Sequence, residues 1–573
     1  MSDRPWIQHY VQGTRPEIPP IQYKHLPDMF RHVATRYATR TAFTQCMPNG
    51  MDASLSYAEN DRLSDAFAAY LRETLKLAPG DRVAVQLPNC LAYPIAAFGI
   101  LKAGCVLVNT NPLYTASEMA HQFADSGARV LVILDMFADR LPAVLPRTKI
   151  ETVVLASIVE RFSPLRAMLV KTVLKYVKKQ VPKATVPHTA FAAALKQGEA
   201  ALSAAKLPGY VAGVELDEVA ALQYTGGTTG VSKGAMLTHR NLLANTMQLE
   251  EVSQHFLRTG EETVLTALPF YHIFAFTVNL LLFYSAGAHD VMVPSPRPVS
   301  NLKTAWAKYP ISWFTGVNTL FNGLLNEPWF RESPPRNLVS SLAGGMALHS
   351  SVAARWKEVT GTPVVEGYGL TETSPVVTFN PIGGMVKDGT IGIPLPSTEV
   401  MLADDAGNAV GVDQPGELLV RGPQVMPGYW QRPDETAKVL DADGWLHTGD
   451  VAAMDDDGYV RIVDRKKDMV LVSGFNVYPN EVEGVIALLE GVAEVGVIGV
   501  PDERTGEAVK AVIVKKDAAL TAEDVIRHCR EHLTSYKIPK QVEFRDELPK
   551  TNVGKILRKD LRAPVVPAAP AAV

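Results

Sequence analysis

An apolar strand, a helix and a second apolar strand follow one another between residues 81 and 111 of this chain. Val83 to Leu87 is an apolar run, Tyr93 to Ala103 has the length and spacing of a helix, and Cys105 to Val108 is apolar again. This order is typical of parallel strands joined by a helix that covers the sheet. The sequence therefore predicts a large α/β fold. The same short apolar pattern recurs at residues 130–134, 152–155, 219–222, 263–267 and 290–293.

The C-terminal part of the chain predicts a small domain of its own. Residues 495–500 and 509–515 are strand-like, and residues 522–533 have a helical pattern. A segment rich in turns and charge, Met454 to Asp468, precedes them. About a hundred residues with their own strands and helix are enough for a separate α+β domain.

The length of 573 residues is enough for three or four subdomains of roughly 150 residues each. We therefore expect a large body of several subdomains, with mixed sheets and helices, over residues 1–465. A small mobile α+β cap is expected over residues 466–573. Its last ten residues, 564–573, are rich in proline and alanine and are expected to be disordered.

Charge and cysteine content exclude several classes of protein. The net charge of −4 argues against a surface built to hold nucleic acid. Residues 1–20 carry charges and prolines and are not a secretory signal. The uncharged stretch 263–289 is interrupted by polar residues and predicts a buried core segment rather than a membrane span. The cysteines are Cys46, Cys90, Cys105 and Cys529, and no two of them form a CxxC pair. A cytoplasmic protein without disulfides or structural zinc is therefore expected.

Residues 161–183 carry seven basic side chains and no acidic one. Leu165, Met168, Leu169 and Tyr176 recur there at helical spacing, so a basic amphipathic helix is predicted. Such a helix can lie on an anionic membrane surface. The alternative is a solvated helix whose apolar stripe packs on the body.

The strongest chemical signal is a loop of glycines and threonines, Thr225 to Lys233, after the apolar run that ends at Leu222. Glycines let backbone N–H groups converge on phosphate oxygens, threonine hydroxyls add donors, and Lys233 supplies positive charge. The loop does not have the spacing of a Walker A motif. It predicts a polyphosphate site, against the alternative of a flexible linker.

Four further clusters carry residue types suited to a nucleotide. Glycines and an aromatic ring suit a base, a hydroxyl beside a carboxylate suits Mg²⁺ on phosphates, and an isolated aspartate suits a ribose diol. Each cluster alone would also fit an ordinary turn or a charged surface. The clusters are Glu366 to Thr373, Trp445 to Asp450, Asp464 to Asp468 and Pro549 to Ile556.

In this order, the five motifs resemble those of the adenylate-forming superfamily, which contains the acyl-CoA synthetases, luciferases and peptide synthetases. The resemblance covers residues 25–562 and is strongest to bacterial long-chain fatty acid CoA ligases. Gly226 stands where many members have Ser, and Ser232 stands where many have Pro. Neither difference removes a phosphate-binding group. The supporting segments are 223–230, 268–274, 315–320, 464–478 and 544–557.

The resemblance implies ATP-dependent activation of a long-chain fatty acid through an acyl-adenylate, with release of pyrophosphate and then of AMP as CoA takes the acyl group. ATP, CoA and Mg²⁺ are therefore the expected small molecules. The implied nucleotide site is Thr225, Gly226, Gly227, Thr228, Thr229, Gly230 and Lys233 for the phosphates, Gly344, Gly345, Tyr368 and Gly369 around adenine, Thr371 at the α-phosphate, Glu372 for Mg²⁺, Asp450 and Arg465 for ribose, and Lys555 between the carboxylate and the α-phosphate.

The resemblance also assigns residues to the second step and to the acyl group. It matches Lys467 to a hinge about which the cap rotates, bringing Ser473, Gly474 and Phe475 to the site for thioester formation. His272 is implied to position substrate, although a lone histidine in an apolar run is more often a core residue. The acyl pocket is expected to involve Phe276, Val317 and Phe321, a composition that core packing would also produce.

Several alternatives stay open at the level of sequence. The acid could be medium-chain, aromatic or a bile acid, because the motifs for ATP do not specify the acid. A catalytically silent nucleotide- or acyl-CoA-binding protein and a membrane transporter are rivals from other classes. A homodimer and peripheral contact with the cytoplasmic face of the inner membrane through residues 161–183 are also open.

Overall fold

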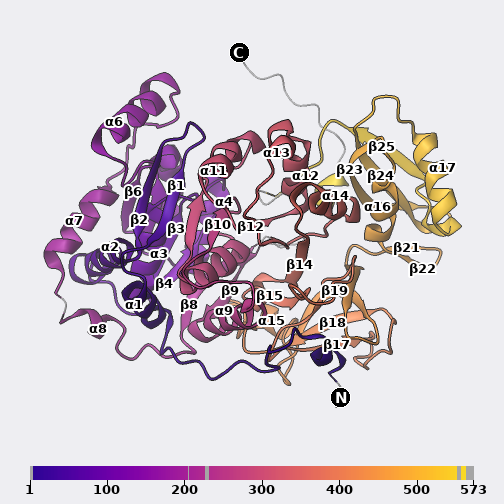
Figure 1. The fold of residues 1–573 in the computed structure, drawn as a ribbon, viewed down its shortest axis with the longest axis horizontal. Coiled ribbons are helices and arrows are strands. Elements are labelled where there is room, and N and C mark those ends of the chain that lie inside the picture. The colour runs from indigo at the N-terminus through magenta and orange to yellow at the C-terminus, as the bar shows by residue number, and fades with distance from the viewer. Residues whose placement is uncertain (1–3, 204, 226–231, 552–555, 563–573) are drawn as a thin grey trace.

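The computed structural model describes residues 4–562, except 204, 226–231 and 552–555. The described residues form an α/β structure built around four sheets (Figure 1). A seven-stranded and a nine-stranded sheet with their helices make up most of the molecule. A four-stranded sheet and a separate five-stranded sheet follow in the C-terminal third of the chain.

The seven-stranded sheet contains the strands expected from the opening pattern. Its neighbours are parallel except for the last pair, β8 and β9, which is antiparallel. The strands in spatial order are β7 (Thr189–Ala190), β6 (Thr152–Ala156), β5 (Val130–Leu134), β3 (Arg82–Gln86), β4 (Val106–Asn109), β8 (Val219–Thr225) and β9 (Lys233–Thr238).

The nine-stranded sheet has a parallel centre and antiparallel edges. Its order is β16 (Ile393–Pro394), β15 (Val376–Phe379), β14 (Val364–Gly369), β13 (Ser340–Ala343), β12 (Trp313–Gly316), β10 (Thr263–Thr266), β11 (His289–Met292), β1 (Thr41–Cys46) and β2 (Asp52–Ser56).

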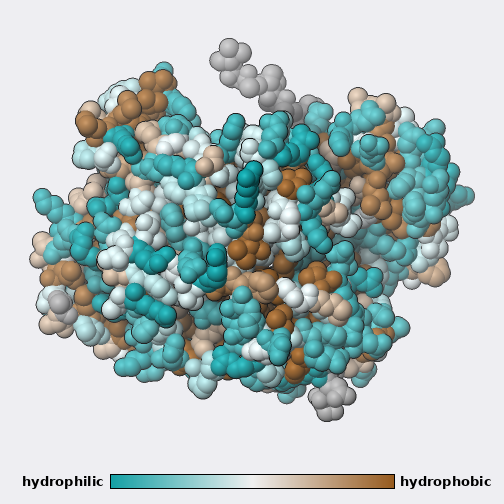
Figure 2. Space-filling view, viewed as in Figure 1, coloured by the Kyte–Doolittle hydropathy of each residue, from teal (hydrophilic) through white to brown (hydrophobic). Residues whose placement is uncertain are grey.

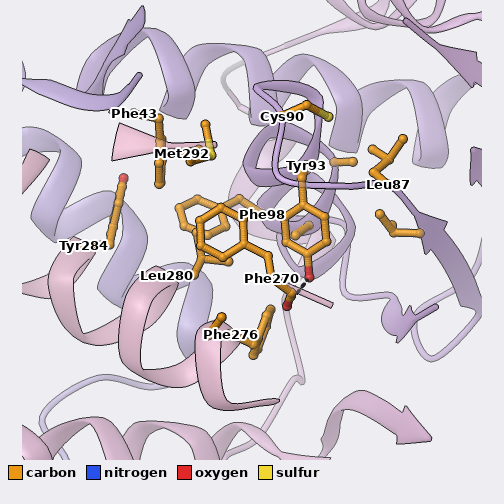
Figure 3. Packing of buried hydrophobic residues seen from close by; sticks show 14 of the residues in the cluster. Phe43, Leu87, Cys90, Tyr93, Phe98, Phe270, Phe276, Leu280, Tyr284 and Met292 are labelled. Carbon is orange, nitrogen blue, oxygen red and sulfur yellow. Dashed lines mark hydrogen bonds between the residues drawn. The ribbon is translucent and has the colours of Figure 1, made fainter. Parts of the chain in front are cut away.

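Helices between the two large sheets bury the main core. α3 (Ala92–Lys102) is buried along its whole length, which explains why its sequence is apolar on every face. Phe98 stacks on Phe30 with ring centroids 3.9 Å apart. The Tyr284 ring meets Phe98 edge-on at 4.9 Å, and both residues are labelled in Figure 3. Phe276 lies in the same cluster, directed into the core.

Local capping sets several helix starts. α9 (His239–Ser253) begins directly after β9 because the Thr238 hydroxyl accepts the N–H of Asn241, whose side chain accepts the N–H of Thr238. The other helices of the body are α1 (Leu26–Arg36), α2 (Tyr57–Ala69), α4 (Ala116–Ser126), α5 (Leu141–Val144), α6 (Pro164–Thr172), α7 (Phe191–Ala201), α8 (Leu207–Tyr210), α10 (Phe283–Ser285), α11 (Lys303–Lys308), α12 (Asn318–Asn326), α13 (Pro328–Glu332), α14 (Ser350–Thr360) and α15 (Pro433–Ala437).

The four-stranded antiparallel sheet is β17 (Glu399–Ala403), β18 (Gly416–Arg421), β19 (Leu446–Met454) and β20 (Val460–Arg465). β20 lies inside the segment 454–468 that the sequence presents as turns and charge. Three of its six residues are charged and no continuous apolar run marks it; one of the charged residues, Asp464, is buried. The charged residues concealed this strand at the sequence level.

The chain enters another sheet between Arg465 and Val470. This sheet runs β22 (Phe475–Val477), β21 (Val470–Val472), β24 (Gly506–Lys515) and β23 (Val492–Asp502), with β25 (Gln541–Arg545) beside β24. Its helices are α16 (Pro479–Ala487), α17 (Ala522–His532) and α18 (Arg558–Leu561). A separate apolar cluster holds it together, and Figure 1 shows it in yellow at one end of the molecule.

The expected buried segment 263–289 is confirmed: it forms β10, the π-helical turn η6 (Ala275–Leu282) and α10, most of which are buried. In the described part of the chain, no helix is long and apolar enough to cross a membrane. The basic helix is shorter than residues 161–183, since it comprises α6 and the π-helical turn η5 (Val173–Val177).

Candidate active site

A cavity of about 1820 Å³ lies where the carboxyl ends of several parallel strands meet the four-stranded sheet and the C-terminal domain. Thr225 ends β8, Gly344 follows β13 and Gly369 ends β14, and all three line its wall. Ligand sites of open α/β sheets form at this edge because the helices that follow the strands diverge there. The motifs far apart in the sequence are brought together at this cavity.

The described ends of the Gly/Thr loop, Thr225 and Lys233, lie on the cavity wall. Gly226, Gly227, Thr228, Thr229 and Gly230 lie outside the described residues. The Lys233 ammonium pairs with Glu435 at 2.7 Å and lies 4.6 Å from the centre of the Tyr429 ring. Lys233 and Lys438 hold the pKa of the Glu435 carboxyl down at about 2, so Lys233 faces a permanent negative charge in the absence of phosphate.

Thr371 and Glu372 lie together in a single helical turn, η8 (Thr371–Thr373), on the cavity wall. The Tyr429 hydroxyl donates to the Glu372 carboxylate at 2.7 Å, which orients that carboxylate and leaves its second oxygen available. Gly369 precedes this turn, and a Cβ there would lie 1.8 Å from the carbonyl oxygen of Pro375. Only glycine allows this close backbone approach, so the turn is held in place by packing of its own backbone.

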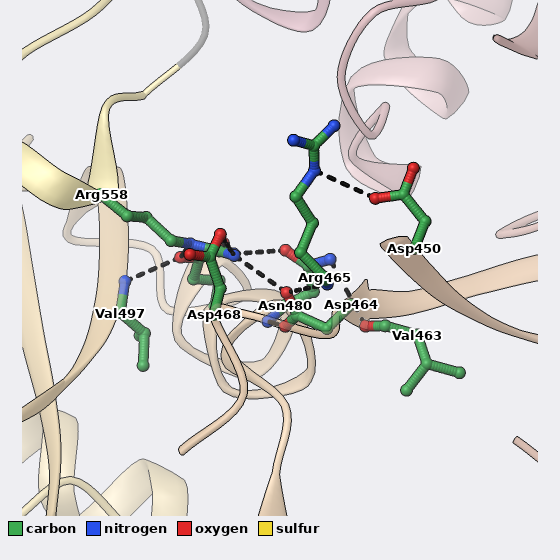
Figure 4. Close-up of polar contacts among 9 residues, drawn as sticks. Asp450, Val463, Asp464, Arg465, Asp468, Asn480, Val497 and Arg558 are labelled. Atoms are coloured by element: carbon green, nitrogen blue, oxygen red, sulfur yellow. Dashed lines mark hydrogen bonds and ion pairs between the residues drawn. The ribbon is translucent and has the colours of Figure 1, made fainter. Parts of the chain in front are cut away.

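Asp450 is buried and held from two sides. Its Oδ2 accepts from the Tyr368 hydroxyl at 2.6 Å. Its Oδ1 pairs with Nε of Arg465 at 3.0 Å, as Figure 4 shows. Burial and the adjacent carboxylate raise the pKa of Tyr368 well above its usual range, so its hydroxyl stays a donor. Each Asp450 oxygen keeps a further lone pair for a ligand hydroxyl.

The loop after β13 brings backbone close to these groups. Gly344 and Gly345 line the cavity, and Gly345 has a φ of 80°, which favours glycine. A Cβ on Gly344 would meet the Gly367 carbonyl and the Phe274 ring, both at 3.3 Å. A flat group can therefore approach the backbone between this loop and Tyr368.

Apolar side chains line the part of the cavity beside η6. His272 lines the cavity, and its Nδ1 accepts the N–H of Phe274 at 3.3 Å. The apolar residues that line this part include Leu249, Leu268, Ile273, Phe274, Val278, Val317, Leu342, Val376 and Phe379.

Only one of the three expected acyl-pocket residues, Val317, is on the cavity wall. Phe276 is directed into the main core (Figure 3), and Phe321 packs edge-on against Trp356 with ring centroids 4.8 Å apart. Both were plausible from composition. The face that Phe276 presents depends on the helical phase, which the π-helical turn η6 alters, whereas Phe321 lies on the α-helix α12. Phe274 and Val278 line the cavity instead.

The C-terminal domain closes one side of the cavity. Lys467, Lys550 and Arg558 lie on its wall, while Lys555 lies outside the described residues. Burial and the nearby Arg465 lower the pKa of Lys467. The lining residues of this domain are Lys467, Asp468, Tyr478, Asn480, Glu481, Glu483, Val495, Lys537, Lys550, Thr551, Ile556, Leu557, Arg558, Lys559 and Arg562.

The segment expected at the thioester step lies elsewhere. Ser473 and Gly474 form the turn between β21 and β22, with φ angles of 50° and 85°. Phe475 is 56% exposed and stacks on Tyr536 at 4.9 Å. None of the three is among the cavity-lining residues described for this arrangement.

Two functional candidates were missed at the level of sequence: Tyr429 and Glu435. Tyr429 follows Gly428, whose carbonyl accepts the N–H of Met236, so this segment pairs with β9 beside the Gly/Thr loop. Glu366 accepts the N–H of Leu348 at 3.0 Å, and burial raises its pKa to about 7. Glu366 is the first residue of the recognised cluster Glu366 to Thr373, whereas no local pattern marks Tyr429 or Glu435.

Residues 30–430 match the family described as AMP-binding enzyme, and residues 481–555 match the AMP-binding enzyme C-terminal domain. The chain therefore belongs to the AMP-binding enzyme family. It is 50% identical over 558 residues to a long-chain-fatty-acid–CoA ligase of Salmonella typhimurium, with 97% of each chain covered. A ligase of the same description from Bacillus subtilis is 38% identical over 568 residues, with 98% of each covered. The crystal structure of ATP-bound MatB from Rhodopseudomonas palustris is 28% identical, with a TM-score of 0.77 and coverage of 94% of this chain and 98% of that one.

Proposed function

We propose that this protein is an AMP-forming ligase that converts long-chain fatty acids to their CoA thioesters. The observation that carries the proposal is one cavity that joins a polar part, with Lys233, Glu372 and Asp450, to an apolar part beside η6. The relatives described above as long-chain-fatty-acid–CoA ligases, similar over nearly the whole chain, support the same assignment.

Two displacements account for the overall reaction. In the first, a carboxylate oxygen attacks the α-phosphorus of ATP, the bond to the pyrophosphate oxygen breaks, and an acyl-AMP anhydride forms. In the second, the thiol of CoA loses its proton and its sulfur attacks the acyl carbon, while AMP leaves with the electrons of the broken C–O bond. Orienting the two anions in line can supply about 7–11 kcal/mol of the barrier reduction.

Different residues are proposed to bind different parts of the nucleotide. Lys233 exchanges Glu435 for the phosphates, which places a fixed cation where negative charge builds up. Asp450, held by Tyr368 and Arg465, accepts the ribose hydroxyls, and the Gly344–Gly345 backbone contacts adenine. Thr371 lies at the α-phosphate, and Lys555 bridges it to the carboxylate.

The residues at η8 fit Mg²⁺, which prefers oxygen ligands and usually keeps substrate phosphate in its shell. The carboxylate of Glu372 faces the cavity, its orientation set by the Tyr429 hydroxyl. Mg²⁺ would neutralise phosphate charge there. Glu372 would hold the ion, while Tyr429 keeps the carboxylate aimed toward it.

The cap, residues 466–573, is proposed to serve both steps by rotating about Lys467. Lys467 lies in the connection between two sheets, where a change in φ and ψ moves one sheet without deforming the other. The cavity now includes residues next to Lys555, which suits acid activation. Rotation would replace them with Ser473, Gly474 and Phe475 for thioester formation.

AMP release with fatty acids of increasing length, with and without CoA, tests the proposal. We expect CoA-dependent AMP release to be greatest for long chains, because the apolar part of the cavity gains contact with each added methylene. Equal or greater rates with benzoate or a bile acid would replace the long-chain assignment by another acid. Matched reactions without ATP control for thioesterase and other background activity.

We further propose that α6 and η5 dock the enzyme on an anionic membrane, where long-chain fatty acids partition. Leu165, Met168 and Leu169 are 77%, 63% and 59% exposed, so the apolar stripe does not pack on the body. Figure 2 shows this stripe as a brown patch at the projecting end of the molecule. The surrounding lysines add attraction of about 1 kcal/mol each near an anionic surface.

Co-sedimentation with phosphatidylglycerol vesicles tests this surface. Replacing Lys171, Lys175, Lys178 and Lys179 with Glu should abolish binding, whereas Lys196→Glu on α7 should not. Neutral phosphatidylcholine vesicles should bind the wild type more weakly. Unchanged binding of the four-lysine variant to phosphatidylglycerol would overturn the proposal, and AMP release in solution checks that the variant is folded.

A further inference from the structure

Arg558 lies at the centre of a buried charge cluster on the wall of the cavity (Figure 4). Its guanidinium contacts Asp464 at 2.9 Å, Asp468 at 3.4 Å and Glu483 at 2.8 Å. The Arg558 side chain is 14% exposed and that of Asp464 is 0% exposed. Charge-assisted hydrogen bonds in such a site are shielded from solvent, so their loss is costly.

The cluster joins two parts of the chain that belong to different sheets. Asp464 is on β20 of the four-stranded sheet, before the connection that contains Lys467. Asp468 lies in that connection, one residue after Lys467, and Glu483 and Arg558 come after it. Of the three carboxylates around Arg558, only that of Asp464 would therefore stay behind if the C-terminal domain rotated about Lys467.

Asp464 also caps a helix of the C-terminal domain. Its Oδ2 accepts the backbone N–H of Asn480 at 2.6 Å, within the first turn of α16. The residue at the N-cap position, Tyr478, makes no side-chain hydrogen bond to that turn. A carboxylate at a helix N-terminus satisfies an open N–H and interacts favourably with the helix dipole. Asp464 thus replaces a cap that the domain lacks in its own sequence.

Every partner of the Asp464 carboxylate is a donor. Oδ1 accepts from Arg558 and from the N–H of Arg465, at 2.9 and 2.7 Å, and Oδ2 accepts from Asn480. A rotation of the C-terminal domain would leave only the Arg465 contact, which lies on the same strand. The buried carboxylate would lose two of its three donors together, and one of the two, Arg558, is its paired cation.

Arg558 is tied to the loop that carries Lys555. Ile556 forms an antiparallel bridge with Lys550, and the N–H of Leu557 donates to the Pro549 carbonyl at 2.8 Å, so the two ends of the loop are joined next to Arg558. Lys550, Ile556 and Arg558 all line the cavity. Holding Arg558 against β20 therefore holds the base of this loop at the cavity.

We propose that Asp464 and Arg558 form a latch across the hinge that favours the acid-activating arrangement and must open before the thioester step. This inference rests on the proposed function. Asp464 is a positioning residue, because it acts through Arg558 and α16 and is not a cavity-lining residue itself. The latch makes the balance between the two half-reactions depend on one buried carboxylate.

Asp464→Asn is the direct test. The amide keeps the shape of the carboxylate but must turn an NH₂ group toward Arg558 or Asn480, both of which are donors. The rate of acyl-AMP formation, followed by pyrophosphate exchange, should fall about tenfold relative to CoA transfer from supplied acyl-AMP. The ratio of the two rates within one preparation cancels any loss of folded enzyme.

Asp468→Asn is the matched control, since it removes the same charge from Arg558 on the side of the hinge that moves with it. Its ratio should stay within about twofold of the wild type. An unchanged ratio in Asp464→Asn, or an equal change in Asp468→Asn, would overturn the latch. Trypsin cleavage at Lys466 and Lys467 gives a second readout, which should be faster in Asp464→Asn and unchanged in Asp468→Asn.

Failure of the proposed function is distinguishable from failure of the latch. A wild-type protein that shows no pyrophosphate exchange with any fatty acid would refute the ligase assignment. A wild type with both half-reactions, whose ratio is insensitive to Asp464→Asn, would refute the latch alone.

Discussion

Glu366 is expected to make the stability of this protein depend on pH in a direction opposite to that of most carboxylates. Its side chain is largely enclosed beside the cavity, accepts the N–H of Leu348, and faces the negative charge of Asp388. Burial is the main cause that raises its pKa from 4.5 to about 7, and Asp388 adds to it. Glu366→Gln substitutes a neutral group of the same shape that can still accept the Leu348 N–H.

The direction of this pH dependence follows from the number of protons that the folded and unfolded states bind. Because the folded-state pKa is the higher one, the folded protein holds the Glu366 proton between pH 4.5 and 7 while the unfolded chain has lost it. The contribution of Glu366 to the stability of the folded state is complete below pH 4.5 and is lost as pH rises toward 7. At about 1.4 kcal/mol for each pH unit, the wild type loses roughly 3 kcal/mol relative to Glu366→Gln over this range.

Thermal unfolding of both proteins at pH 5 and pH 8, without ATP, measures the effect. We expect the Tm difference, variant minus wild type, to become more positive by several degrees at pH 8. The conversion is about 2–4 °C for each kcal/mol in a subdomain of roughly 150–250 residues. Glu358→Gln, on an exposed position of α14, is the control and should show no such change.

A Tm difference that does not change with pH would show that Glu366 titrates normally in the folded state. A difference that falls between pH 5 and pH 8 would mean that the carboxylate is stabilised in its ionised form, for example by an unrecognised cation contact. Either result would refute the argument from burial.

Three further predictions concern the half-reactions and the backbone at the site. Lys555→Ala should reduce acyl-AMP formation by at least 100-fold while leaving CoA transfer from supplied acyl-AMP largely intact; equal survival of both would remove its assigned role. Lys467→Pro should spare pyrophosphate exchange and block thioester formation, and an equal loss of both would argue against a hinge there. Gly369→Ala places a Cβ 1.8 Å from a carbonyl oxygen and should lower the Tm, at a cost of about 1–3 kcal/mol or more, and weaken ATP binding. Gly484→Ala, in α16 with open space around it, should be neutral or stabilising by up to about 1 kcal/mol, and a similar Tm loss in both variants would contradict the steric argument.

Much of the fold was predictable because its strands are buried on both faces and are therefore short apolar runs. The run at 130–134 coincides with β5, and the helix after β3 begins and ends within one residue of its predicted bounds. β20 was missed because three of its six residues are charged, so it contains no continuous apolar run. Apolar runs locate buried strands, and half-exposed strands are hidden by their polar face.

The nucleotide motifs were also readable, since each depends on neighbours in sequence: glycines that free backbone donors, or a hydroxyl beside a carboxylate. The acyl pocket was less predictable. Phe276 and Phe321 have the right composition, yet both are directed into the core, and Phe274 and Val278 line the cavity. For Phe276, a π-helical turn shifts the phase of side chains relative to an α-helix, which periodicity alone does not reveal. For Phe321, on the α-helix α12, composition does not say which face meets the cavity.

By itself, the sequence determined the α/β class, the buried strands, the family motifs and the basic helix, because these depend on local pattern and residue chemistry. Only the tertiary structure decided which distant groups meet. It placed Glu435 against Lys233, and it brought Asp464 to Arg558 and to the open end of α16. Such pairs form because the sheets bring remote strand ends to one edge, where a buried charge must find a partner wherever in the chain it occurs.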